Sequence, residues 1–283
     1  DPSFDRAFVY KNPIARESRW WGGEPIWVTA LRQGERAATM FWVGADAQIR
    51  GSRPSRWYSY SHAEPFTARA DSVLAWLDLP AAERPRLIMS YFEEPDGAGH
   101  KYGPDAPETR AAVLRVDSVL AQVMAGIAAR HLDDSVDIVI VADHGMSEIS
   151  RSRVVYLDDV VDSANVKVVY QSPLLMIGAR DGDDAALLAR LRRLPHLTVW
   201  KKADVPARLH YGTNPRITPI VGVADAGWSI AWRHGEAITN LGAHGYDNAV
   251  PDMRALFLAR GPNFRPGSTI AEFPNVDVYE LLA

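Results

Sequence analysis

The chain passes from a strand-like run to an acidic, glycine-containing loop at residues 87–100, which read LIMSYFEEPDGAGH. The first six of these residues are mostly apolar and include β-branched and aromatic side chains, a composition typical of a strand buried on both faces of a parallel sheet. The remainder supplies carboxylates, two glycines and a histidine. We therefore expect residues 87–92 to form a core strand that delivers Asp96 and His100 to one edge of a sheet.

A second run of this kind lies at residues 136–141, VDIVIV, and is followed directly by an Asp-His pair. Between the two runs, apolar residues recur at helical spacing from about Glu108 to His131. The predicted apolar face of this helix consists of Val113, Val116, Leu120, Val123, Met124 and Ile127. Strand, helix and strand in this order predict a right-handed βαβ unit.

Other segments carry the same kinds of pattern. They predict helices at residues 66–77 and 184–194, strands within residues 167–177 and 217–232, and one more strand at residues 255–259. The mixture predicts an α/β fold with a decorated central sheet. We expect a single domain over residues 1–283, with a possible insertion at about 181–232.

Composition limits the function classes. A chain of 283 residues that is 47% hydrophobic can bury a sizeable core, and a net charge of -4 does not indicate a surface for nucleic-acid polymers. Because the chain has no cysteine, any metal ion must be held by His, Asp or Glu. No uninterrupted apolar run approaches the roughly 20 residues of a membrane helix, so no membrane segment is expected.

Two acid–histidine pairs and one glycine-flanked histidine are the candidates for chemistry. In an open parallel sheet, ligands bind beside the carboxyl ends of the strands, which is where both pairs are predicted to lie. The predicted metal ligands are Asp96, His100, Asp143, His144 and His244. Each pair alone is better explained by a surface or structural role. Their shared position after predicted core strands favours a metal site, whereas the remaining histidines are assigned to packing, caps or the surface.

The ligand types also indicate the metal. Histidine nitrogens and carboxylate oxygens suit Zn²⁺ when thiolates are absent, and they favour zinc over Mg²⁺. A catalytic zinc ion usually keeps about three protein ligands and one open position. Two ions would then need about six ligands, and the candidates supply all but one of them. We expect the last ligand to lie upstream of this chain.

Residues 91–104, YFEEPDGAGHKYGP, closely resemble the signature of the nucleotide pyrophosphatase/phosphodiesterase family, which belongs to the alkaline phosphatase superfamily. Further resembling segments occur in family order and lie at residues 21–27, 76–80, 142–146, 208–211 and 244–248. The resemblance covers nearly the whole chain. It implies an alkaline-phosphatase-like central sheet flanked by helices, with inserted segments, in a bacterial-type member of the family.

The resemblance implies two zinc ions. One would be bound by Asp96, His100 and His244, and the other by Asp143, His144 and an upstream Asp. The nucleophile of the family, a Thr or Ser, would also lie upstream, so no catalytic nucleophile is assigned on this chain. The N-terminus starts without an initiator Met or a signal sequence, and we therefore expect an N-terminal portion to be missing.

The implied reaction is hydrolysis of nucleotide phosphodiester or pyrophosphate bonds through a covalent Thr/Ser intermediate, with release of nucleoside 5′-monophosphate. Tyr91 and Tyr60 match nucleotide-contacting aromatic positions of the family, and stacking on a tyrosine ring tolerates any base. Their alternative roles are a core strand residue for Tyr91 and an exposed loop residue for Tyr60. Asp247 and Asn248 are predicted to hold the loop of His244 by local hydrogen bonds.

Other functions stay open at this point. Within the superfamily the alternatives are a phosphomonoesterase and a choline-lipid phosphodiesterase. A non-catalytic metal-binding protein is the alternative of another class, and it applies if the natural protein begins at Asp1. The resemblance implies a periplasmic or secreted location, while oligomeric state and the preferred nucleotide are not indicated by the sequence.

Overall fold

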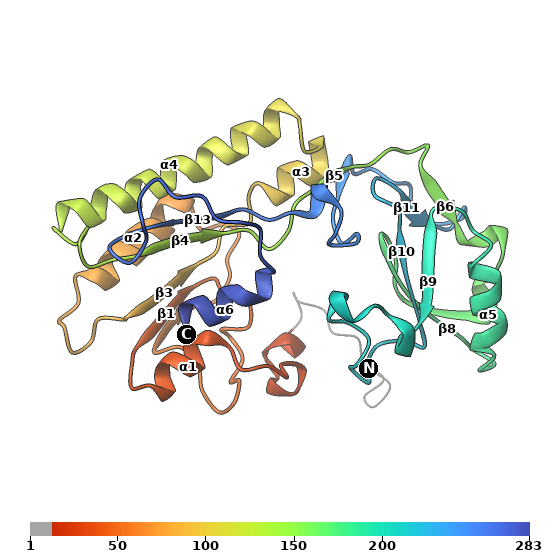
Figure 1. Ribbon diagram of the computed structural model, residues 1–283, viewed down its shortest axis with the longest axis horizontal. Helices are drawn as coiled ribbons and strands as arrows, with labels where there is room; N and C mark the ends of the chain where they lie inside the picture. The colour runs from red at the N-terminus through yellow and green to blue at the C-terminus, as the bar shows by residue number, and fades with distance from the viewer. Residues whose placement is uncertain (1–12) are drawn as a thin grey trace. The chain divides into compact units, whose positions relative to one another are not determined.

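The computed structural model describes residues 13–283, and internal contacts divide them into two compact units. The unit that we call the parallel unit comprises residues 13–94, 112–140 and 257–283. The unit that we call the antiparallel unit comprises residues 95–111 and 141–256. Helices and strands occur in both (Figure 1), which confirms the predicted α/β class.

A three-stranded parallel sheet forms the centre of the parallel unit. Strand β1 (Ala37–Met40) lies between β2 (Arg56–Tyr58) and β3 (Leu87–Ser90), and Met40 is opposite both Tyr58 and Ser90 in the register. The carboxyl ends of the three strands therefore lie at one edge. The fully buried β1 was missed in the sequence, because three of its four side chains, those of Ala37, Ala38 and Thr39, are small and give no strong apolar signal.

Strand β4 (Ile138–Val141) pairs with β13 (Phe257–Arg260). The two strands predicted as a simple βαβ unit, β3 and β4, thus belong to separate hydrogen-bonded sets within the described chain. Their side chains are half-buried, with Val141 38% exposed, rather than fully buried as predicted. Each of them has a single hydrogen-bonded neighbour among the described strands, which leaves one side of the strand more open.

Helices pack on both faces of this sheet. On one face, α1 (Ile26–Arg32) contributes to a cluster of Trp27, Val28, Ala37, Leu87 and Met89. On the other face, α2 (Phe66–Leu77) and α4 (Pro107–Ala129) contribute to a cluster of Leu74, Leu77, Ile88, Ile127 and Ile138. Neighbouring residues of β3 therefore face opposite clusters, as the two-residue period of a strand requires.

Helix α4 matches its predicted range, but its buried face differs in part. Val113, predicted to face the core, is 48% exposed, whereas Val119 is 4% exposed. By length and composition, α4 is the one helix of the described chain that is apolar enough to cross a membrane. This helix bears only weakly on the expectation of no membrane segment, which counted uninterrupted apolar runs, whereas Arg115 and Asp117 interrupt this one. Core helices of soluble proteins can have the same length and composition.

The C-terminal segment returns to α1. It contains the 3₁₀ turn η8 (Asn275–Asp277) and helix α6 (Val278–Leu282). The Tyr279 hydroxyl makes a hydrogen bond with the Thr29 hydroxyl of α1, and the two helices lie beside one another in Figure 1. Near the start of the described chain, the 3₁₀ turns η1 (Pro13–Arg16) and η2 (Ser18–Trp20) precede α1.

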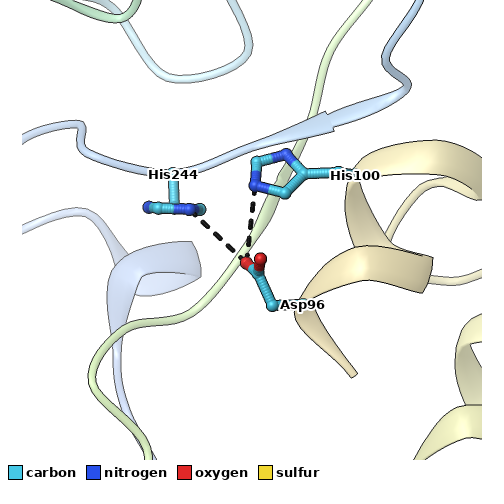
Figure 2. A group of neighbouring side chains, drawn as sticks. All are labelled: Asp96, His100 and His244. Carbon is cyan, nitrogen blue, oxygen red and sulfur yellow. Dashed lines mark ion pairs between the residues drawn. The ribbon is translucent and has the colours of Figure 1, made fainter. Parts of the chain in front are cut away.

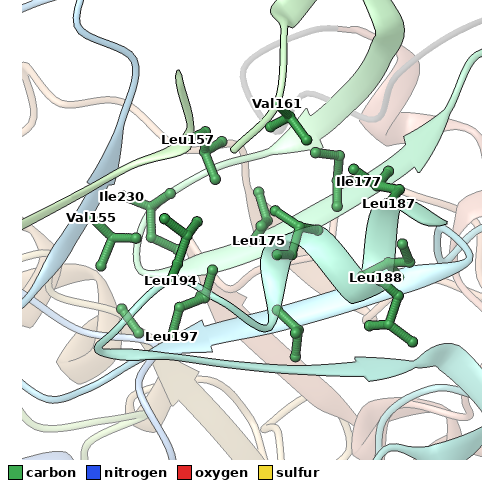
Figure 3. Packing of buried hydrophobic residues seen from close by; sticks show 14 of the residues in the cluster. Val155, Leu157, Val161, Leu175, Ile177, Leu187, Leu188, Leu194, Leu197 and Ile230 are labelled. Carbon is green, nitrogen blue, oxygen red and sulfur yellow. The ribbon is translucent and has the colours of Figure 1, made fainter. Parts of the chain in front are cut away.

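A four-stranded antiparallel sheet forms the main body of the antiparallel unit. Its order is β7 (Val166–Tyr170), β8 (Leu174–Ala179), β10 (Ile220–Ala224) and β9 (Leu197–Lys201). Helix α5 (Asp184–Leu191) packs on it, and the Asp183 side chain caps the helix by accepting a 3.0 Å hydrogen bond from Ala186 N. The core between helix and sheet includes Leu175, Ile177, Leu187, Leu188 and Leu197 (Figure 3). That residues 181–232 are an insertion stays a prediction.

Shorter elements complete this unit. Helix α3 (Asp96–Tyr102) follows the loop after β3, and β5 (Ser147–Glu148) pairs with β12 (Gly242–Ala243) in antiparallel register. Strand β6 (Val154–Tyr156) pairs in parallel with β11 (Ser229–Ala231). The remaining turns are η3 (Leu157–Asp159), η4 (Ser163–Asn165), η5 (Lys202–Asp204), η6 (Ala207–Leu209) and η7 (Pro251–Met253).

Candidate metal centre

Helix α3 carries the first acid–histidine pair. The sequence predicted a tight glycine turn here, but residues 96–102 form a short α-helix with Asp96 in its first turn. Spacing of four residues places Asp96 and His100 on one face of a helix, one turn apart. The two side chains therefore point at the same region because of helix geometry rather than because of a turn.

Close packing of two glycines brings the His244 loop to α3. A Cβ atom on Gly242 would lie 2.3 Å from the main-chain oxygen of Gly99, so only glycine fits. The contact is reinforced by a 2.8 Å hydrogen bond from Leu241 N to His100 O. Pairing of β5 with β12 places the 143–146 loop beside the same strand. Three segments distant in sequence thus meet within the antiparallel unit.

Asp96, His100 and His244 come together as one group. Their potential ligand atoms all lie within 4.8 Å of one another, and Figure 2 shows both imidazoles pointing toward the carboxylate. Asp96 Oδ1 is 3.4 Å from Nε2 of His100 and 3.4 Å from Nε2 of His244. This oxygen is buried and has no hydrogen-bond partner among the described residues. A buried carboxylate oxygen left without a donor and facing two imidazole nitrogens fits a bound cation.

Main-chain carbonyls determine which imidazole nitrogen is available in two histidines. His100 Nδ1 lies 2.8 Å from Gly242 O, and His144 Nδ1 lies 2.9 Å from Gly145 O. A carbonyl oxygen only accepts, so Nδ1 carries the proton in both rings. Nε2 is then left with its lone pair, which is the arrangement that a metal-binding histidine needs.

The second pair lies beside the first group. The ring of His144 stacks on that of His244, with centroids 3.5 Å apart and planes 13° apart. Asp143 Oδ2 is 3.4 Å from His144 Nε2, and the Asp143 side chain is 79% exposed. Within the described chain, Asp143 and His144 are not joined by a third acid or histidine to form another group of three. The structure therefore places all five predicted residues near each other but assembles one complete group.

Burial keeps His244 uncharged. It lowers the pKa of His244 below the ordinary value of 6.5, and the neighbouring His144 ring lowers it further, while Asp96 opposes the shift. The net direction favours the neutral imidazole at neutral pH. A neutral imidazole is the form that binds a metal ion.

Two anchors hold the loop that follows His244. The Tyr246 ring is 7% exposed in the core, and its hydroxyl donates a 2.9 Å hydrogen bond to Trp228 O. Burial raises the pKa of Tyr246 to about 12, so the hydroxyl stays protonated. The Asp247 carboxylate accepts hydrogen bonds from both terminal nitrogens of Arg208 and from Ala249 N. Two fixed residues therefore lie two and three positions after His244.

Arg208 is a residue of this site that sequence reasoning missed. It lay within a segment that resembles the family, but no role was assigned to it. Its guanidinium also donates to the Asn248 side chain at 2.9 Å. The predicted hydrogen bonds of Asp247 and Asn248 are thus not only local, because they extend to the segment containing η6. A single arginine in a short 3₁₀ turn, between Ala207 and Leu209, gives no sequence signal for such a contact.

Tyr60 and Tyr91, the predicted nucleotide-contacting residues, belong to the parallel unit. Their rings meet edge to face, with centroids 6.4 Å apart and planes 63° apart. Tyr60 also meets Phe41 edge to face at 5.6 Å. Both side chains are half-buried. The structure thus brings the two tyrosines together, and their contact with a nucleotide stays a prediction.

The chain is similar to known proteins over most or all of its length. Residues 1–247 match the family model described as type I phosphodiesterase / nucleotide pyrophosphatase. The venom phosphodiesterase CdcPDE of Crotalus durissus collilineatus is 37% identical over 292 residues, which cover 100% of this chain and 35% of that protein. Ectonucleotide pyrophosphatase/phosphodiesterase family member 3 of Rattus norvegicus is 37% identical over 93% of this chain and 31% of its own length. The chain thus spans about a third of the curated relatives that it matches.

Solved structures share the fold. Murine ectonucleotide pyrophosphatase/phosphodiesterase 5, an inactive variant in complex with AMP, superposes with a TM-score of 0.88 and 34% identity. The match covers 97% of this chain and 71% of that chain. It confirms the predicted fold class, an alkaline-phosphatase-like sheet flanked by helices. Taken with the family-model match, it establishes that the chain belongs to the type I phosphodiesterase / nucleotide pyrophosphatase family.

Proposed function

We propose that this chain contributes the metal centre of a zinc-dependent enzyme that hydrolyses phosphodiester or pyrophosphate bonds of nucleotides. In this proposal Asp96, His100 and His244 bind one Zn²⁺ ion, and Asp143 and His144 bind a second. The observation that carries it is the buried Asp96 Oδ1, which faces two imidazole Nε2 atoms at 3.4 Å and lacks a hydrogen-bond donor among the described residues.

The chemistry of the ligands supports zinc. Paired divalent ions stabilise the charge on the attacking and leaving oxygens of an in-line displacement at phosphorus. The task of the protein is to hold neutral imidazoles and carboxylates in place. His100 and His144 do so through Nδ1–H donation to main-chain carbonyls, and His244 does so through burial, which lowers its pKa. Imidazole-rich sites without thiolate suit Zn²⁺ better than Mg²⁺ or Ca²⁺.

The proposal places two groups outside the described residues. Asp143 and His144 need a further ligand, and a Thr or Ser hydroxyl must act as nucleophile; both are proposed to come from an N-terminal portion of the protein. The hydroxyl oxygen forms a bond to phosphorus as the bond to the leaving oxygen breaks, and water then releases the nucleoside 5′-monophosphate. Trapping a nucleotidylated Thr or Ser peptide by acid quench and mass spectrometry tests this step.

The proposed substrate is a nucleotide. AMP is bound in the solved murine relative, and this supports a nucleotide ligand here. Tyr60 and Tyr91 are proposed to contact the base, because paired aromatic rings bind bases of any identity by stacking. The names of the relatives, venom phosphodiesterases and ectonucleotide enzymes, support a secreted or extracellular location; a periplasmic location and a bacterial-type subgroup stay predictions.

Activity measurements on the full-length protein test the proposal. We expect turnover of p-nitrophenyl thymidine 5′-monophosphate well above that of p-nitrophenyl phosphate or a choline phosphodiester. Chelation should abolish it, and Zn²⁺ should restore it. A dominant rate on the monoester or on the choline substrate would instead support a phosphomonoesterase or a lipid phosphodiesterase.

A non-catalytic metal-binding protein is the alternative of another class. It predicts metal content without turnover of any of the three substrates. Metal analysis of the purified full-length protein, run beside the activity assay, separates the two classes. Absence of bound transition metal from active protein would rule out the assignment of the five ligands.

A further inference from the structure

Arg69 of α2 is a charged side chain placed where the sequence pattern favours an apolar one. It lies three residues after Phe66 and four before Val73, on the inner face of the helix, and it is 0% exposed. Burial of an unpaired charge is strongly unfavourable. Its partners within the parallel unit therefore explain why it is tolerated.

Glu93 is the first partner. Its two carboxylate oxygens accept hydrogen bonds from the Arg69 terminal nitrogens at 2.5 and 3.1 Å. The same nitrogens donate to the main-chain oxygens of Tyr91, at 3.1 Å, and Glu64, at 3.2 Å. A bidentate arginine–carboxylate pair has fixed geometry as well as strength. The Arg69 guanidinium thus binds both the segment that follows β3 and the loop before α2.

Phenyl rings enclose the remaining faces of the guanidinium. Its carbon lies 4.8 Å from the Phe41 ring centre, 4.6 Å from that of Phe66 and 5.9 Å from that of Phe92. A cation over an aromatic face is attracted by the ring, more strongly when water is excluded. The guanidinium is therefore held in its plane by hydrogen bonds and across its faces by aromatic rings.

This pair reaches both predicted base-contacting tyrosines. Arg69 binds the main-chain oxygen of Tyr91, and Phe41, which covers Arg69, meets the Tyr60 ring at 5.6 Å. His62 Nδ1 lies 3.3 Å from Glu93 Oε1 and 3.3 Å from the Tyr60 hydroxyl. Burial and the Glu93 carboxylate raise the pKa of Tyr60 above its ordinary value. The ion pair thus contacts the main chain of Tyr91 directly. It reaches Tyr60 indirectly, at the ring through Phe41 and at the hydroxyl through His62.

A contribution to stability alone does not account for this arrangement. Replacement of buried ion pairs by apolar residues of similar size is often neutral or stabilising. We propose that Arg69 and Glu93 are positioning residues that hold Tyr60 and Tyr91 for stacking on a nucleobase, and that they thereby set nucleotide affinity and not the rate of bond cleavage. This inference rests on the proposed function, in which the two tyrosines contact the base.

The positioning role of Arg69 and Glu93 can be tested with two substrates that differ only in the base-bearing part. These are p-nitrophenyl thymidine 5′-monophosphate and methyl p-nitrophenyl phosphate, which have the same leaving group. In zinc-loaded full-length protein, Arg69→Met and Glu93→Gln should raise KM for the nucleotide substrate about tenfold, since one base–aromatic stack corresponds to roughly 5- to 150-fold in affinity. KM for the methyl substrate, and kcat for both, should change less than about twofold.

A matched control and a coupling test sharpen the result. The control is Asp78→Asn, which breaks the bidentate pair of Asp78 with Arg130 in the same unit. The Asp78 side chain is 57% exposed, and this substitution should change KM and kcat for neither substrate. Adding Glu93→Gln to a variant that carries both Tyr60→Leu and Tyr91→Leu should raise KM no further, because the ion pair acts through these two rings. Product binding, measured calorimetrically with thymidine 5′-monophosphate, should weaken in parallel.

Each other outcome is decisive. Equal losses on the two substrates, a further rise in KM when Glu93→Gln is added to the Tyr60→Leu/Tyr91→Leu variant, or unchanged KM in folded Glu93→Gln protein would overturn the inference while leaving the proposed function intact. If wild-type protein cleaves neither diester, the proposed function fails and the inference fails with it. Should Arg69→Met not fold, the test rests on the milder Glu93→Gln, alone and combined with the two tyrosine substitutions.

Discussion

Two of the three histidines of the metal centre owe their usable form to a main-chain carbonyl. Gly242 O and Gly145 O accept from Nδ1 of His100 and His144, which leaves Nε2 for a metal ion. His244 differs, because it stacks on His144 and is kept neutral by burial. Single side chains in this site are therefore expected to affect metal binding far more than stability.

The first prediction concerns His244. Replacement by Ala removes one of three grouped ligands, so metal affinity should fall by more than about 100-fold, above the loss typical of an outer-shell change. The measurement is zinc content after dialysis against a competing chelator. His196→Ala is the control, since His196 also stacks on an aromatic ring, that of Trp228 at 3.6 Å, but is not in the ligand group. Equal zinc content in the two variants would contradict the assignment.

The second prediction concerns Arg208, which acts on the metal centre through its contacts with Asp247 and Asn248. Arg208→Ala should weaken zinc binding by about three- to tenfold, less than the loss for a direct partner of a ligand, because the pair is partly exposed. Arg208→Lys keeps the charge but loses the bidentate contact, and it should rescue only part of the affinity. Arg233→Ala, which breaks the exposed pair with Asp159, is the control and should leave zinc affinity unchanged.

Among the elements, the contact of α3 with β12 matters most for the site. It depends on the absence of a side chain at Gly242, where a Cβ would meet Gly99 O at 2.3 Å. A short helix and a two-residue strand contribute little stability alone. Their mutual placement brings Asp96 and His100 to His244, so a small displacement of either element separates the ligands.

A third prediction follows for this contact. Gly242→Ala should destabilise the protein by about 1–3 kcal/mol, the usual cost of overpacking, and should lower zinc affinity at the same time. Chemical denaturation and a zinc titration measure the two effects. Gly22→Ala serves as control, because a Cβ at Gly22 meets nothing within 4 Å and its φ is not positive. A neutral Gly242→Ala would show that α3 and β12 are not held by this approach.

For the molecule as a whole, one buried ion pair makes stability depend on pH. Burial alone raises the pKa of Glu93, but the hydrogen bond and charge of Arg69 outweigh it and hold the pKa below its ordinary value of 4.5. A carboxylate whose folded-state pKa is lowered stabilises the fold above its unfolded-state pKa. That contribution is lost as the pH falls through the folded-state pKa.

The fourth prediction is that Glu93→Gln flattens the acid limb of the stability curve. Wild-type protein should lose stability on acidification below about pH 4.5, and the variant should lose less over the same interval. Urea midpoints measured from pH 7 to pH 3 provide the test. Glu236→Gln, at an exposed position, is the control and should follow the wild-type curve. Parallel curves for Glu93→Gln and wild type would contradict the prediction.

Local patterns predicted the elements of this chain well. Helix 66–77 was predicted with its observed bounds, and the two strands that precede the acid–histidine pairs were found within the predicted runs. Segment 167–177 proved to contain two strands, because the turn at Ser172-Pro173 divides it. Periodicity and strand composition report the burial of neighbouring residues, which is a property that the sequence carries directly.

By itself, the sequence determined the α/β class, the family and the identity of five candidate ligands, because each depends on residue types at short spacing. Tertiary structure alone decided that Asp96, His100 and His244 form one group, that Arg208 reaches Asp247, and that Arg69 is buried against Glu93. These contacts join segments far apart in the chain. They depend on how whole elements pack, and no local pattern encodes the relative placement of two elements that meet only in the folded protein.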